Sequence, residues 1–465
     1  MTRRMATVWA PLLLILLVPL CGFGPQDAPV APADWIVTAA PAYAPLAALH
    51  GGERFPKGAE LLRVRDGKAE LLVPDFAATA DASVSFDGKA VLFSGKKAAG
   101  DSWQIYELTL GDHAVRKVPT DAADAIRPLY LPAGHMVYAQ RVGPKFELRS
   151  APTGSTPPAD AHEYWDMSPA FAISHLSANA IPSDVLADGR ILFEAGYPLG
   201  TETTPELYLV YSDGSGVESY RCDHGRGRWA GRQLASGDVI FTHGATLARF
   251  TSPLAHETHV TAPQAEYEGG IAETADGGWL VSAKAGRGAQ ATIRLWRPGA
   301  PAMQTALART GEDLVEPVLL APHARPHRHP SGLHPWDYAN LLVLDARLSR
   351  EGDLKTLPTA VRLETQDANG QPKAMGTAPV EKDGSFFVKV PGDRPIRLAL
   401  VDAKGTVLRT EHGWFWARGG EQRICVGCHT GPERASDNRV PGVLLRTTTP
   451  ADLTGAGRAK PAGGR

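Results

Sequence analysis

Two cysteines and a histidine lie close together near the C-terminal end of the 465-residue sequence, in the stretch RICVGCHTGP. Cys425 and Cys428 are separated by two residues, and His429 follows at once. This spacing is typical of covalent haem attachment, in which each thiol adds across one vinyl group and the histidine ligates the iron. Half of a zinc site or a redox disulfide is the alternative. Since the sequence has neither a second such cysteine pair nor a thioredoxin-like βαβ pattern, it favours haem c.

Aromatic and cationic residues surround this motif. Trp414, Phe415 and Trp416 offer flat apolar surfaces that could shield a haem ring. Arginines bind carboxylates through paired hydrogen bonds, so those of this region are either ligands of the haem propionates or ordinary solvated residues. The candidates are Arg418, Arg423, Arg434 and Arg439.

A sixth ligand for the iron, or a second metal ion such as zinc, requires further donors. The densest run of histidines is APHARPHRHPSGLHPWDY, which contains His323, His327, His329 and His334. Imidazole suits both metals, but a Pro-rich linker with unbound histidines has the same composition. His412 and Met375 are further candidates for the sixth position. If that position is vacant, chemistry at the iron is favoured over simple electron transfer.

The first residues have the pattern of an export signal. Arg3 and Arg4 precede an apolar run at 8–20 that is too short and too interrupted by proline for a comfortable membrane span. We therefore expect residues 1–23 to be a secretory signal and the protein to be periplasmic or otherwise exported. Cys21 could carry a lipid anchor, although the preceding Leu20 is larger than is usual there, and a retained membrane anchor is a further interpretation.

The composition limits the classes of partner. The chain has 48 Lys and Arg, 50 Asp and Glu and a formal net charge of −2, without a basic tract, so nucleic acid is not an expected partner. Its 48 glycines and 38 prolines favour turn-rich β structure over a helical bundle. Cys222 has no evident disulfide partner once Cys21 leaves with the signal or is acylated, and we expect it to be a buried small hydrophobe.

A phrase recurs through the middle of the chain. SFDGKAVLFSG, LADGRILFEAG and LASGDVIFTHG each place a glycine turn before a run of apolar and β-branched residues, as in a hairpin followed by a strand. The interval of roughly 40–55 residues is that of four-stranded propeller blades, and a tandem of β-sandwiches is the alternative. The turn glycines are Gly88, Gly134, Gly189, Gly237 and Gly277.

The two ends of this repeat region complement each other. Residues 61–73 have the pattern of an outer hairpin without an inner strand, and residues 313–326 have that of inner strands without an outer hairpin. Pairing them closes a ring of about six blades, or seven, and removes exposed sheet edges. We therefore predict an all-β fold with a linker at 24–57 and a β-propeller at 58–345. The turns resemble those of the TolB-like propellers of the periplasm.

After the propeller the pattern changes. Alternating runs around the Asp383-Gly384 and Lys404-Gly405 turns predict a small β-sandwich at 346–410. Residues 411–445 have almost no strand pattern and are predicted to be an irregular haem-binding segment. Residues 446–465 are predicted to be a disordered tail.

The C-terminal half resembles the hydrazine synthase alpha subunit family. The resemblance depends on DGSF from Asp383, on GE just before the motif and on CVGCH, and it extends over roughly residues 58–445. It implies an exported propeller with a haem-bearing segment, in which Cys425 and Cys428 hold haem and His429 is a metal ligand. The synthase subunit is a multihaem protein of a larger assembly, whereas this chain has one such motif. The resemblance therefore implies the architecture and the covalent haem, but not hydrazine synthesis.

These features together predict an exported monohaem c-type cytochrome on a propeller scaffold, which exchanges electrons with a partner protein. One alternative is a haem enzyme that acts on a small nitrogen or oxygen species at an open iron site. Another is a propeller that binds a partner and carries the haem as an accessory. Membrane contact is expected only through a lipid anchor at Cys21.

Overall fold

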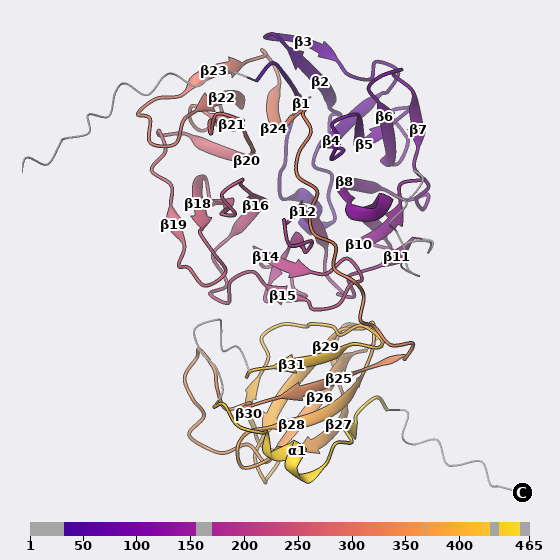
Figure 1. Cartoon of the computed structure of the whole chain (residues 1–465), viewed down its shortest axis with the longest axis vertical. Coiled ribbons are helices and arrows are strands. Elements are labelled where there is room, and N and C mark those ends of the chain that lie inside the picture. The colour runs from indigo at the N-terminus through magenta and orange to yellow at the C-terminus, as the bar shows by residue number, and fades with distance from the viewer. Residues whose placement is uncertain (1–31, 155–169, 368, 428–436, 456–465) are drawn as a thin grey trace, which may run out of the picture.

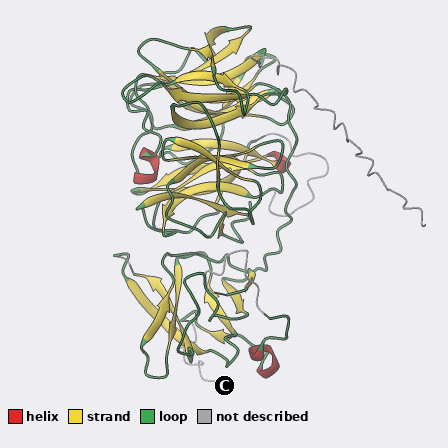
Figure 2. Cartoon of the chain, turned by 90° about the vertical axis from the view of Figure 1, so that its left-hand side faces the viewer, coloured by secondary structure: helices red, strands yellow, loops and turns green. Residues whose placement is uncertain are grey.

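The computed structural model describes residues 32–154, 170–367, 369–427 and 437–455. These residues form eight four-stranded sheets and very little helix, which confirms the all-β prediction. Six of the sheets follow one another around a ring, and the other two form a module below it (Figures 1 and 2). The predictions for residues 1–23, for Cys21 and for the end of the tail lie outside the described residues.

The six sheets of the ring are blades A to F, and the strands of each blade follow one another from the centre of the ring outward. Blade A contains β24 (Asp313–Leu319), β1 (Asp34–Ala40), β2 (Glu60–Arg65) and β3 (Lys68–Leu71). Blade B contains β4 (Ala78–Val84), β5 (Ala90–Lys96), β6 (Gln104–Thr109) and β7 (Val115–Lys117). Blade C contains β8 (Ala125–Leu131), β9 (His135–Val142), β10 (Lys145–Pro152) and β11 (Phe171–Ala172).

The remaining blades have the same order. Blade D contains β12 (Ala180–Val185), β13 (Ile191–Tyr197), β14 (Thr204–Val210) and β15 (Glu218–Ser219). Blade E contains β16 (Arg228–Gln233), β17 (Val239–His243), β18 (Thr246–Phe250) and β19 (Thr258–His259). Blade F contains β20 (Glu266–Glu273), β21 (Trp279–Lys284), β22 (Thr292–Trp296) and β23 (Gln304–Leu307). Two short 3₁₀ helices, η1 (Ala47–His50) and η2 (Pro132–Gly134), lie in the connections.

The glycine turns that mark the repeat join the first and second strands of blades B to F. All five glycines have positive φ, between 71° and 89°, a conformation that residues with a side chain rarely adopt. At Gly189 there is also no room for a side chain, because an added Cβ would lie 2.2 Å from the carbonyl oxygen of His327. The recurring phrase in the sequence is therefore the inner hairpin of each blade.

Blade A closes the ring by joining the two ends of the propeller. β24 pairs antiparallel with β1, with Asp313 opposite Ala40 and Leu319 opposite Trp35, and β1 continues into the β2–β3 hairpin. The β2–β3 hairpin and β24 thus share the blade that closes the ring, as predicted, but they do not pair directly, because β1 lies between them. The predicted linker at 24–57 is wrong for residues 34–40, because these residues form the second strand of the closing blade.

Bulges in the inner strands bring charged side chains together near the centre of the ring. Asp81, Arg127 and Glu316, from three different blades, have φ of 61°, 54° and 56°. Arg127 Nη2 donates to Glu316 Oε1 over 2.8 Å. Buried Arg54 donates to Asp81 through one Nη atom and to Glu316 through the other. Pairing is needed here because an unpaired buried charge is strongly destabilising.

The C-terminal module is a two-sheet sandwich. One sheet contains β31 (Gln422–Cys425), β25 (Tyr338–Val343), β28 (Phe386–Pro391) and β32 (Ala451–Asp452). The other contains β27 (Pro372–Pro379), β26 (Ala360–Gln366), β29 (Ile396–Val401) and β30 (Val407–Thr410). Leu341, Val361, Leu363, Phe386 and Val388 are fully buried between the two sheets.

Three boundaries of this module differ from the prediction. The propeller ends at β24 rather than at residue 345, since β25 belongs to the sandwich. β31 lies within the segment predicted to be irregular, and β32 lies within the predicted tail. Both strands pair in parallel with strands far away in sequence, so no local hairpin pattern predicts them. A short helix, α1 (Gly442–Arg446), precedes β32.

The segment between β24 and β25 runs across the ring toward the sandwich (Figure 1). Its backbone is fixed to inner turns of two blades, since His323 N donates to Phe86 O and His327 N donates to Ala187 O. Near the sandwich, His334 N donates to Gly420 O. The Pro- and His-rich run is therefore a docked strap.

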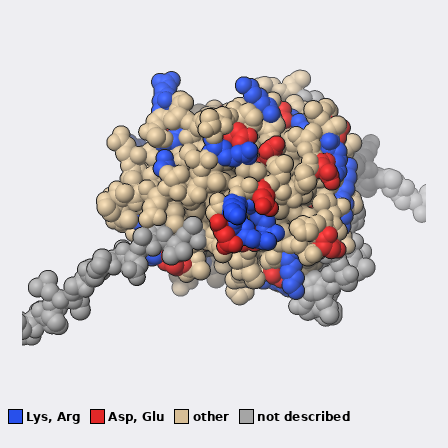
Figure 3. All heavy atoms as spheres, turned by 90° about the horizontal axis from the view of Figure 1, so that it is seen from above, with Lys and Arg blue, Asp and Glu red and all other residues tan. Residues whose placement is uncertain are grey.

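Acidic and basic side chains are interspersed on the face of the molecule in Figure 3, in keeping with the near-zero net charge. Within the described part of the chain, no helix has the length and apolar character needed to cross a bilayer.

Candidate functional site at the junction of the propeller and the sandwich

Cys425 is the last residue of β31, at the edge of the sandwich that faces the propeller (Figure 1). β31 runs parallel to β25 with Cys425 opposite Val343, and Leu344 N donates to the Cys425 carbonyl over 2.9 Å. The first cysteine of the motif is thus held by a sheet and not by a loose tail. Cys428 and His429 lie outside the described residues.

Cys425 lines a cavity of about 680 Å³ between blade D and the sandwich. We call it the junction cavity. The propeller contributes the end of β13, β14 and the segment 215–224, and the sandwich contributes 411–415 and 421–427. A cavity of this volume is in the range that holds small-molecule cofactors.

Aromatic side chains form much of the propeller wall of the junction cavity. Tyr197 stacks on His224 with ring centroids 4.5 Å apart and an angle of 11°, and Tyr208 lies 6.1 Å from the same imidazole. Cys222 also lines the cavity and is half-buried, so it is not the fully enclosed small hydrophobe that we expected. His224 could not be predicted from the sequence, because it shares a cavity with Cys425 only after two distant parts of the chain have docked.

Arg423 is the cationic residue of the sandwich wall. Its Nη2 donates to the Val217 carbonyl over 2.5 Å, and its guanidinium carbon lies 5.6 Å from the centre of the Phe415 ring. Its Nη1 is buried and has no hydrogen-bond acceptor among the described residues; Glu421 Oε1 is 3.8 Å away. An arginine nitrogen without an acceptor beside a cavity is suited to an anionic group of a ligand.

The Cys425 side chain has a largely apolar environment. Burial raises the pKa of the thiol, although the neighbouring Arg423 acts in the opposite direction. Ile424 and Val426, on either side of it, are 67% and 37% exposed. Cys425 thus lies in the wall of the junction cavity between two partly exposed apolar residues.

The two tryptophans before the motif have different environments. Trp414 lines the junction cavity, with Arg397 stacked 4.6 Å from its ring and its backbone N–H donating to the Leu199 carbonyl. Trp416 does not line this cavity: its ring is fully buried in the propeller core, and Nε1 donates to the Gly214 carbonyl over 2.8 Å. The expectation that Trp416 shields a haem is therefore wrong for this arrangement, because the ring anchors the sandwich to blade D.

A polar contact beside Trp416 completes this docking. Arg418 Nη1 donates to His175 Nε2 over 2.9 Å and lies 3.1 Å from Asp393 Oδ1. Burial lowers the pKa of His175 to about 4, with Arg418 adding to the effect and Asp393 opposing it. The neutral imidazole can therefore accept a hydrogen bond from the guanidinium. Arg418 is a docking residue in this structure and does not line the junction cavity.

The other predicted ligands lie at several places. His412 lines the junction cavity and is paired with Glu351. Arg439 is half-exposed, lies 3.8 Å from Asp437 and is not part of the cavity wall. Met375 packs against the sandwich core. Arg434 lies outside the described residues.

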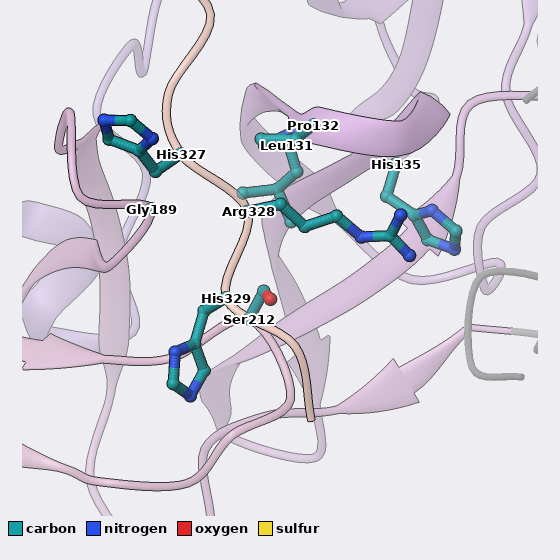
Figure 4. Close-up of a pocket in the computed structure, with 8 residues that line it drawn as sticks. All are labelled: Leu131, Pro132, His135, Gly189, Ser212, His327, Arg328 and His329. Carbon is teal, nitrogen blue, oxygen red and sulfur yellow. The ribbon is translucent and has the colours of Figure 1, made fainter. Parts of the chain in front are cut away.

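The histidines of the strap are spread along it. His329 stacks on Tyr211 with centroids 3.7 Å apart, His334 stacks on Trp336, and His323 packs against Phe86 with the two rings tilted by 60°. His327 and His329 border a cavity of only about 10 Å³, in which the Arg328 side chain extends toward His135 (Figure 4). Within the described ranges, none of these histidines belongs to a group of three close metal ligands. A zinc site in the strap, as considered from the sequence, therefore has no support from their placement.

The fold and the site define a β-propeller protein with a C-terminal sandwich module and a cysteine-bearing cavity at their junction. Residues 341–430, which include the second half of β25, all of β31 and the cysteine motif, match the family model described as the hydrazine synthase alpha subunit middle domain. The resemblance seen in the sequence is thereby confirmed. No curated protein matches this sequence.

Among solved structures, hydrazine synthase shares this architecture. Hydrazine synthase of Kuenenia stuttgartiensis superposes with a TM-score of 0.75 at 16% identity, over 90% of this chain and 71% of the other. TolB of Acinetobacter baumannii gives 0.44 at 10% identity, over 62% of this chain and 66% of that one. The propeller domain of the Pyrococcus furiosus trilobed protease gives 0.36 at 12% identity, over 54% and 88%. At these identities the first likeness shows a shared fold.

Proposed function

We propose that this chain is an exported c-type haem protein that exchanges electrons with a partner protein. The observation that carries the proposal is the position of Cys425, which ends an ordered strand on the wall of a cofactor-sized cavity. The match of residues 341–430 to a hydrazine synthase alpha subunit domain supports it, since that match includes the cysteine motif.

The residues of the junction cavity fit a haem. Tyr197, Tyr208 and Trp414 supply flat aromatic surface, and Nη1 of Arg423, which has no hydrogen-bond acceptor among the described residues, suits a propionate. Cys425 and Cys428 would hold the group through thioethers, and His429 would ligate its iron. A haem bound there supplies a one-electron Fe(III)/Fe(II) couple.

The surroundings of Cys425 support electron exchange with a protein. The exposed Ile424 and Val426 lie at the rim of the junction cavity, so a redox partner could approach its contents without unfolding either module. Aromatic and aliphatic groups around a cofactor exclude water and thereby tune its reduction potential. Hydrazine synthesis is not part of the proposal.

The test is to produce the mature protein in a host that matures c-type cytochromes and to record its pyridine haemochrome spectrum and intact mass. We expect one covalent haem per chain, and its loss in Cys425→Ser and Cys428→Ser. Cys222→Ser is the matched control, since Cys222 lines the same cavity outside the motif and its replacement should leave the covalent haem in place. A correctly processed chain without added haem mass would refute the proposal.

A second candidate is haem chemistry on a small nitrogen or oxygen species. The polar groups on the cavity wall favour it, because Tyr197 and the His224 imidazole could hold or move a proton at a bound molecule. The two candidates predict different spectra. A high-spin ferric protein that binds cyanide or nitrite rapidly supports an enzyme, and a low-spin, ligand-inert protein supports electron transfer.

A further inference from the structure

A second group of metal-ligand side chains lies on blade E, apart from the cysteine motif. His243 is the last residue of β17, and His259 is the last residue of β19, on the far side of β18 in the same sheet. Glu257 directly precedes β19. The sheet thus brings together three side chains that are 14 and 2 residues apart in the chain.

The ligand atoms of these residues converge. His243 Nδ1 is 2.5 Å from Glu257 Oε1, and His259 Nε2 is 3.8 Å from the same oxygen. All three ligand atoms lie within 4.8 Å of one another. Two ligand atoms of a tetrahedral zinc ion, each 2.0–2.2 Å from the metal, are about 3.3–3.6 Å apart, so His243 Nδ1 and Glu257 Oε1 must separate by about 1 Å while His259 moves slightly closer. Within the described residues, this is the one such group of three or more ligands.

The carboxylate is held in an orientation that favours metal binding. Arg228 donates through Nε to Glu257 Oε2 over 2.7 Å, which leaves Oε1 directed at the two histidines. Arg228 is itself fixed by a two-pronged contact with Asp223, at 2.7 and 3.0 Å, and lies over the Phe250 ring. Such outer contacts orient metal ligands and restrict their motion.

The donor set indicates which ion the group would take. Two imidazoles and one carboxylate bind zinc in proteins and leave a fourth position for water, whereas calcium and magnesium prefer oxygen ligands alone. His259 is 67% exposed, so an ion can enter from solvent and the ring can turn toward it, while Glu257 is only 12% exposed. We propose that His243, Glu257 and His259 form a zinc site of three protein ligands on blade E.

A competing interpretation is an ordinary His243–Glu257 ion pair beside a solvated His259. Isothermal titration of the mature full-length protein with Zn²⁺ alone separates the two. We expect His259→Ala to remove one equivalent of zinc, or to weaken its binding more than tenfold, since it deletes one of three ligands. His256→Ala is the matched control: this histidine lies next to Glu257, but its Nδ1 faces Arg221. It should bind zinc as the wild type does.

Zinc K-edge X-ray absorption identifies the atoms that coordinate the bound zinc, so it distinguishes a lost ligand from a general loss of folding. At this site zinc has nitrogen and oxygen neighbours at about 2.0–2.2 Å and the outer scattering of two imidazoles, whereas zinc at the cysteine motif has sulfur at about 2.3 Å. Sulfur in the shell of the tightest equivalent, or unchanged zinc binding in His259→Ala, would overturn the proposal. Because zinc binding is measured independently of haem, a negative result would refute the zinc site and leave the proposed function unaffected.

Discussion

Trp416 connects the sandwich to the propeller, and its replacement by alanine tests whether this connection holds the junction cavity together. The indole is fully buried and buries about 200 Å² of surface, which at about 25 cal/mol per Å² corresponds to about 5 kcal/mol. Measured truncations of buried tryptophan cost about 3–5 kcal/mol. The variant also leaves the Gly214 carbonyl without its hydrogen-bond donor, which adds to the cost. We therefore expect a loss of at least about 3 kcal/mol.

The assay is guanidinium unfolding of Trp416→Ala, followed by circular dichroism, together with limited proteolysis of the strap at 320–337. We expect a loss of about 3–5 kcal/mol in the transition that includes the sandwich and faster cleavage of the strap. Trp336→Ala is the matched control, because Trp336 is 38% exposed and should cost less than about 1 kcal/mol. If the two variants unfold alike, the sandwich does not depend on this anchor and our account of the docking is incorrect.

Three further changes test the buried charges. Arg54→Ala leaves the buried Asp81 without its ion-pair partner and leaves Glu316 with Arg127, and it should cost about 3–5 kcal/mol in urea unfolding; a cost below about 1 kcal/mol would show that the central network is dispensable. Burial raises the pKa of Glu206 to about 7, against the pull of Arg228, so the folded state retains a proton that the unfolded state loses. Stability therefore falls as the pH rises from about 4.5 to 7, and Glu206→Gln should abolish that fall in midpoints measured across this range. Burial lowers the pKa of His175 to about 4, so the contribution of its neutral imidazole to folding stability is lost as the pH falls from 6.5 toward 4. Cleavage of the strap should therefore increase over this pH range in the wild type but not in His175→Gln.

The ring could be predicted from the sequence because its elements are local. Each of blades B to F begins with a hairpin whose glycine has positive φ, so the turns at Gly88 and Gly237 are visible in the sequence without any tertiary information. β1 escaped prediction because DWIVTAA stands between segments rich in alanine and proline, and its partner β24 lies at the other end of the ring. Long-range pairing of this kind leaves no local signal.

The candidate site could be predicted only in part, for the same reason. The spacing around Cys425 is visible in the sequence and is enough to suggest the proposed thioether attachment, since that attachment requires only neighbouring residues. The opposite wall, with Tyr197 and His224, comes from blade D and depends on the docking of the sandwich. Trp416 was assigned to the site because it is adjacent in sequence to Trp414, but its ring turns into the propeller core while that of Trp414 faces the cavity. Which way each ring turns is decided by the docking of the sandwich on blade D.

The closing blade also imposes an order of assembly. β1 emerges early from the ribosome, yet its neighbour β24 follows only after five complete blades, so one edge of β1 stays unpaired for most of synthesis. An open strand flank recruits other chains, and the nascent molecule is therefore most vulnerable to misassociation just before residue 313 arrives. The sandwich follows β24 in the chain, so it can dock on blade D only after β24 has been synthesised and can pair with β1.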